Sequence, residues 1–163
     1  MIVPSFSPVY SDSIVCLPNT DALYSVDVLR GLPDGQHKVS VNRVDNTLIR
    51  AIDVRLFLDV APSTDPNGNG YLALYMLGGI SPNLLSNGYT GSSYDVWSLS
   101  HATLLAAIPC NSNSVIQTEI SVLTYVSSLP KYFTFALQNK CGVSLATNRT
   151  NRMDMVFVNY EYL

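Results

Sequence analysis

The chain contains few side chains that are suited to acid–base catalysis. Its two histidines, His37 and His101, are far apart in the sequence. His37 follows a turn, and His101 lies in an apolar stretch, so both are expected to be surface or packing residues. The two glutamates, Glu119 and Glu161, fall on the polar faces of predicted strands. Glycoside hydrolysis requires a pair of carboxylates that flank the substrate, and these glutamates do not predict one.

Motifs for metal, nucleotide or acyl-enzyme chemistry are not found in the sequence. There is no GxSxG elbow and no phosphate-binding glycine loop. Asp59, Asp65 and Asn67 supply oxygen atoms of the kind that calcium binds. Their spacing does not match an EF-hand, and turn formation explains them better. We therefore expect no cofactor, no bound metal and no enzymatic activity.

The three cysteines, Cys16, Cys110 and Cys141, have spacings that match no zinc motif. One disulfide with a spare thiol is an alternative, but we predict three buried free thiols. Free thiols favour a reducing compartment.

Basic residues are dispersed along the chain, and the formal net charge is −3. A strong nucleic-acid binder shows a clustered basic stripe. We expect these basic residues to be scattered, solvated charges. The alternative is a modest positive face, because the first and last strands of a jelly roll are neighbours and could bring Arg30 and Arg152 together. Any binding of nucleic acid would then be weak and non-specific. The candidate nucleic-acid contacts are Arg30, Lys38, Arg43, Arg50 and Arg152.

Composition predicts a domain whose surface is partly covered. Only 13% of the 163 residues are charged and ten are tyrosines, whereas ordinary domains carry about 25% charge. Interfaces are depleted in charge and enriched in aromatic residues, which favours subunit contacts. The alternative is a monomer with a polar, uncharged surface. We find neither a transmembrane stretch nor a signal peptide, and expect no membrane partner.

Residues 1–20 are predicted to form an extended arm rather than a packed element, and residues 21–163 a single domain. Short helical turns are expected near Asp95. Alternating apolar residues, which indicate strands, cover 22–30, 38–44, 47–61, 71–77, 102–108, 114–126, 142–146 and 152–162, and residues 131–137 are a short aromatic stretch. We expect subunit contacts to be made by four loops: 31–36, 62–70, 80–94 and 109–113.

The most regular stretch is 47–61. One of its faces is almost wholly apolar and the other carries Asp53, Arg55 and Asp59. Because alternate side chains of a strand point to opposite sides, the apolar face is predicted to line the core. The predicted core residues are Leu48, Ile52, Val54, Leu56 and Leu58.

These strands predict an all-β fold, an antiparallel eight-stranded jelly-roll β-sandwich. The order of ALYSVDVLR, TLIRAIDVRLFLDVA, GYLALYML, SVIQTEISVLTYV and RMDMVFVNYEYL resembles the coat proteins of small icosahedral viruses. The nearest match in size is to plant satellite viruses, and coats of single-stranded DNA viruses are similar. The resemblance implies a virion protein that forms a closed homo-oligomeric shell around viral RNA or single-stranded DNA. Such coats often begin with a basic arm, whereas residues 1–20 contain no Lys or Arg.

A second function class is a jelly-roll module that binds carbohydrate or a receptor. In that case aromatic side chains would stack on sugar rings beside Asp or Asn residues of the loops. The candidates are Tyr71, Tyr89, Tyr94 and Trp97.

Overall fold

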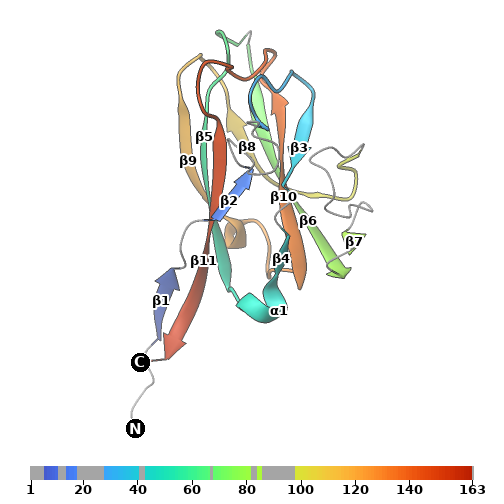
Figure 1. Cartoon of the computed structure of the whole chain (residues 1–163), viewed down its shortest axis with the longest axis vertical. Coiled ribbons are helices and arrows are strands. Elements are labelled where there is room, and N and C mark those ends of the chain that lie inside the picture. Colours follow the sequence, from blue (N-terminus) through green and yellow to red (C-terminus); the bar gives the residue numbers. More distant parts are fainter. Residues whose placement is uncertain are drawn as a thin grey trace.

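The computed structural model of the chain is a sandwich of two antiparallel sheets with almost no helix (Figure 1). The all-β prediction is therefore confirmed. The structure describes residues 6–10, 14–17, 28–40, 43–66, 68–81, 84–85 and 98–162. In this part of the chain, no helix is long and apolar enough to cross a membrane.

The first sheet has the order β1-β11-β5-β9, and β2 also pairs with β11. Its strands are β1 (Phe6–Tyr10), β2 (Ile14–Leu17), β5 (Asp53–Val60), β9 (Ile116–Ser121) and β11 (Arg152–Tyr162). Residues 1–20, expected to be an extended arm, thus supply two segments that hydrogen-bond to the last strand instead of standing apart.

The second sheet has the order β3-β10-β6-β7; β4 also pairs with β10, and β8 with β6. Its strands are β3 (His37–Val39), β4 (Val44–Asp45), β6 (Tyr71–Ser81), β7 (Leu84–Leu85), β8 (Thr103–Pro109) and β10 (Tyr132–Lys140). Two short helical turns, α1 (Asn46–Ile49) and η1 (Val122–Thr124), follow β4 and β9.

The core lies between the sheets and follows the alternation of the strands. Val54, Leu56 and Leu58 of β5 are at most 3% exposed, and they pair in register with Phe157, Met155 and Met153 of β11. From the second sheet the buried side chains include Leu72, Leu74, Phe133, Phe135 and Leu137. Phe133 and Phe135 meet edge to face, with ring centroids 5.5 Å apart.

The prediction for Leu48 was wrong, because β5 begins at Asp53 and not at Thr47. The Asp45 carboxylate accepts a hydrogen bond from the Thr47 backbone N–H at 3.0 Å and starts α1. Arg50 ends that turn in the left-handed region, with φ of 55°. Leu48 is consequently 79% exposed, whereas Ile52 is half-buried. Local capping therefore overrides the alternating pattern over these residues.

Several other predicted elements have different bounds. The described residues contain eleven strand segments, not eight, because 38–44 is split between β3 and β4 and short segments were missed. β6 continues through Gly78 and Gly79, and 114–126 changes from β9 to η1 at Val122. Residues 142–146 form only an isolated bridge, Pro62 to Leu145. Residues 28–30 begin a turn, and the rest of 22–30, like the turns expected near Asp95, lies outside the described residues.

The loops at the end opposite α1 are bound tightly to one another (Figure 1). Cys110 and Cys141 form a disulfide with a Cα–Cα distance of 5.7 Å, so the prediction of three free thiols was wrong. The two cysteines directly follow β8 and β10, which pair with β6 on its two sides, and they meet at the N-terminal end of β6. Gly70 permits this approach, because a Cβ there would lie 2.7 Å from the Cys141 carbonyl oxygen.

Two fully buried asparagines fix the same end. Asn139 donates from Nδ2 to the carbonyls of Leu32 and Val143, both at 2.8 Å. Asn151 accepts from the Ala61 N–H at 3.0 Å and donates to the Ala146 carbonyl at 2.8 Å. Their amides satisfy loop backbone groups that would otherwise be buried without partners.

Candidate functional site: the outer face of the first sheet

The outer face of the first sheet carries a row of charged side chains around one aromatic ring. Asp53, Arg55, Phe57 and Asp59 of β5 point away from the core, because Val54, Leu56 and Leu58 point into it. The register places Phe57 between Glu119 of β9 and Asp154 of β11. In the next outward row, Asp59 lies between Gln117 and Arg152. Cross-strand neighbours of this kind are within contact distance.

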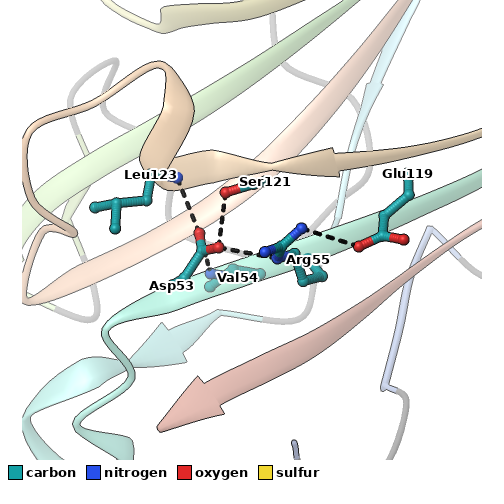
Figure 2. A network of polar contacts seen from close by, with 6 residues as sticks. All are labelled: Asp53, Val54, Arg55, Glu119, Ser121 and Leu123. Atoms are coloured by element: carbon teal, nitrogen blue, oxygen red, sulfur yellow. Dashed lines mark hydrogen bonds and ion pairs between the residues drawn. The ribbon is translucent and has the colours of Figure 1, made fainter. Parts of the chain in front are cut away.

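Asp53 organises one end of this face, as Figure 2 shows. It is only 5% exposed. Its Oδ1 accepts from the Leu123 N–H at 2.9 Å, and its Oδ2 accepts from the Ser121 hydroxyl at 2.7 Å. Arg55 Nε lies 3.0 Å from Oδ2, in an ion pair that is not aligned as a hydrogen bond. These contacts hold the bend at which β9 passes into η1.

Ion pairs continue along the face toward the loop end. Arg55 Nη1 lies 3.1 Å from Glu119 Oε1 (Figure 2). Arg149 pairs with Asp59, and Arg152 pairs with Asp154. Each carboxylate keeps lone pairs that can accept further hydrogen bonds.

Phe57 and its neighbours form a shallow depression of about 440 Å³. Its lining comprises Phe57, Leu58, Asp59, Gln117, Thr118, Glu119, Arg152 and Asp154. The Phe57 side chain is 39% exposed. The lining combines an apolar ring with three carboxylates, one guanidinium and one side-chain amide. We call this feature the Phe57 depression.

The predicted nucleic-acid contacts lie on separate elements. Arg152 begins β11 in the Phe57 depression and pairs with Asp154. Arg30 is exposed in the turn at the loop end, and Lys38 is half-buried in β3 of the other sheet. Arg43 and Arg50 are exposed on either side of β4 and α1, at the opposite end. Their role in binding nucleic acid stays a prediction.

The other residues considered for chemistry are also dispersed. His37 lies in β3 and the exposed His101 lies before β8, its Nδ1 3.2 Å from the Ser100 hydroxyl. Of the proposed calcium ligands, Asp59 pairs with Arg149, Asp65 accepts from the Asn113 N–H at 2.8 Å, and Asn67 lies outside the described residues. No group of three or more His, Cys, Asp or Glu residues that could hold a metal occurs in the ranges the structure describes.

The aromatic residues of the carbohydrate alternative are not tested as a group. Tyr71 begins β6, with the Lys140 ammonium 5.7 Å from its ring centroid. Tyr89, Tyr94 and Trp97 lie outside the described residues.

Sequence reasoning identified the outward face of β5, Phe57 included, but did not predict that Gln117 of β9 and Asp154 of β11 lie beside it. The alternation of β5, β9 and β11 indicated which residues share a face. It did not indicate that these three strands lie side by side. No protein-family model matches this chain, and no curated protein matches its sequence.

Proposed function

We propose that the protein is the coat subunit of a small icosahedral virus, built as a jelly roll and located in the virion. The observation that carries the proposal is the order of strand pairing. Segments that share one neighbour occupy a single position: β1 with β2 on β11, β3 with β4 on β10, and β7 with β8 on β6. This leaves eight positions in two sheets of four.

Numbered along the chain, these positions pair 1 with 8, 2 with 7, 3 with 6 and 4 with 5. That is the pattern of one long antiparallel hairpin rolled around the core. Two further pairings, β11 with β5 and β10 with β6, close the roll into two sheets. Such an arrangement of two Greek keys is characteristic of viral capsid domains and lectins, and supports the resemblance drawn from the sequence.

Self-assembly is supported by apolar side chains that a single copy leaves in solvent. Of the seven large apolar residues that are exposed in the described part of the chain, four belong to α1, to η1 and its C-terminal cap, or to the end of β6, toward the α1 end (Figure 1). Their exposed fractions are 79% for Leu48, 88% for Ile80, 43% for Leu123 and 49% for Tyr125. Exposed apolar area is usually covered by a partner, and identical subunits usually associate with closed symmetry.

Genome binding in this proposal is weak and non-specific. Arg30, Arg43 and Arg50 are exposed and dispersed, and Lys38 is half-buried. The affinity for single-stranded nucleic acid should therefore fall with salt by about 0.7 log units per log salt for each phosphate neutralised. Poly-U and a mixed-sequence RNA of the same length should bind with the same affinity.

Sedimentation velocity over a range of protein concentrations, with and without RNA, tests the proposal. We expect large, discrete particles, which negative-stain microscopy should show as closed shells. A species of about 18 kDa that stays monomeric under every condition would contradict it.

A second candidate is a carbohydrate-binding module, favoured by the Phe57 depression. Its partly exposed ring and surrounding carboxylate and amide groups are suited to a sugar, whose C–H face stacks on an aromatic ring while its hydroxyls donate hydrogen bonds. Titration calorimetry with a panel of oligosaccharides tests it. Binding that is lost in Phe57→Ala and kept in Leu104→Ala, an exposed residue of the other sheet, would support this candidate.

A further inference from the structure

The chain contains one acceptor sequence for N-linked glycosylation. Asn148-Arg149-Thr150 is the only stretch in which an asparagine is followed, after one residue other than proline, by serine or threonine. Such a sequence is used only where two conditions hold. The asparagine must lie on the surface, and the chain must pass through the compartment in which glycans are attached to proteins.

The acceptor sequence lies in a short loop, residues 147–150, whose two ends are held in place. Before the loop, the Ala146 N–H donates to the Ala61 carbonyl at 2.8 Å. After it, the fully buried Asn151 donates from Nδ2 to the Ala146 carbonyl at 2.8 Å. The loop therefore projects from a fixed base at the end of the sandwich that carries the disulfide, which we call the disulfide end (Figure 1).

The two groups that define the acceptor face the solvent. Arg149, between them, is half-buried and pairs with Asp59 of β5. Asn148 and Thr150 are both exposed. Among the described residues, neither of these two side chains has a hydrogen-bond partner. The Asn148 amide is thus accessible, and a glycan attached to it would extend into solvent without displacing a contact. The first condition is met.

The Cys110–Cys141 disulfide carries the second condition. Both cysteines are 0% exposed, and thiol–disulfide exchange requires a thiolate to reach a sulfur atom. The bond must therefore form while the chain folds, when the two thiols give two electrons and two protons to a disulfide oxidant, which is reduced to two thiols. Reducing compartments keep thiols unpaired. Folding consequently takes place in an oxidising compartment, the kind in which N-linked glycans are attached.

We infer that Asn148 is N-glycosylated as the chain folds in an oxidising, secretory compartment. The donor is an oligosaccharide carried on a lipid pyrophosphate. Asn148 Nδ2 forms a bond to the anomeric carbon of the oligosaccharide, and the bond from that carbon to the pyrophosphate oxygen breaks. The lipid pyrophosphate leaves and takes up the proton that the amide loses.

This inference does not depend on the coat function proposed above. The glycan would stand at the disulfide end, whereas the exposed apolar residues Leu48 and Ile80 lie toward the α1 end. Those residues therefore stay available for contacts between copies.

Expression of the full chain behind a cleavable secretory leader in eukaryotic cells tests the inference. Gel mobility before and after treatment with peptide N-glycosidase, followed by peptide mass spectrometry, reports the glycan and its position. We expect one glycan on the wild type and on Thr150→Ser, and none on Asn148→Gln or Thr150→Ala. Asn111→Gln is the matched control and should match the wild type, because Asn111 is an exposed asparagine of the disulfide end outside the acceptor sequence.

Two further measurements make a negative result decisive. Val115→Thr creates a second acceptor at the exposed Asn113, and Val115 is itself 49% exposed. A secreted wild type without a glycan, beside a Val115→Thr variant that carries one on Asn113, overturns the inference. A glycan that persists in Asn148→Gln also overturns it. Alkylation of the secreted, denatured protein without reductant should modify Cys16 alone, and modification of all three cysteines would contradict the argument from the disulfide.

Discussion

Asp53 is the residue whose loss should weaken the first sheet most through polar contacts. In Asp53→Ala, the Leu123 N–H and the Ser121 hydroxyl lose a charged acceptor (Figure 2). Hydrogen bonds to charged groups contribute about 1.5–3 kcal/mol each, and a buried donor left without a partner carries a comparable penalty. Arg55 loses less, because its side chain is 36% exposed and it keeps Glu119.

The sum is a fall of about 3–4 kcal/mol in the free energy of unfolding. At roughly 2–4 °C per kcal/mol for a chain of this length, the thermal midpoint should fall by about 10 °C. Asp53→Asn preserves the shape and one acceptor oxygen, so about half the loss is expected. Urea unfolding followed by far-UV circular dichroism, on oxidised protein at low concentration, measures the loss of unfolding free energy in both variants.

Asp59→Ala is the matched control. Asp59 lies on the same strand and the same face, but its side chain is 34% exposed and pairs with Arg149. Partly exposed ion pairs contribute little, so a loss of about 0.5–1 kcal/mol is expected. If Asp53→Ala were no more destabilising than Asp59→Ala, the assignment of Asp53 as the organiser of the β9–η1 bend would be refuted.

Three further predictions concern the core and the loop end. Leu56→Ala should lower the free energy of unfolding by about 2–5 kcal/mol, whereas Leu48→Ala should change it by less than about 0.5 kcal/mol; equal urea midpoints would show that the core face is misassigned. Cys110→Ser should cost about 3.7 kcal/mol, the chain-entropy value for the 31-residue separation. A reductant should destabilise the wild type by a similar amount and leave the variant unchanged. Gly70→Ala should cost about 1–3 kcal/mol through its clash with Cys141, and calorimetry showing an unchanged melting midpoint would contradict the close approach.

Figure 1 makes clear that the two ends of the sandwich differ. At one end a disulfide and two buried asparagines bind the loops together, while at the other α1 and η1 leave Leu48 and Leu123 exposed. Three of the loops expected to make subunit contacts lie at the disulfide end: 31–36, 62–70 and 109–113. The fourth, 80–94, lies largely outside the described residues. The contribution of these loops to subunit contacts stays a prediction.

The sequence by itself determined the fold class and the inward face of the main strands. Apart from Phe57, residues 53–60 alternate between polar and apolar, and Val54, Leu56 and Leu58 are buried as predicted. β11 has the bounds that the pattern predicted, Arg152–Tyr162. Such alternation is local information, because it depends only on the twofold period of a strand. For the same reason the pattern failed at Leu48, where a capped turn replaces the strand.

Only the tertiary structure decided which strands are neighbours, and with them the candidate site. Arg55 and Glu119 form an ion pair although they are 64 positions apart, and Phe57 lies between Glu119 and Asp154 only because β5 lies between β9 and β11. The Cys110–Cys141 disulfide likewise depends on β8 and β10 flanking β6. A hydrophobic pattern specifies which side of a strand is buried, but pairing partners are selected by the packing of the whole chain.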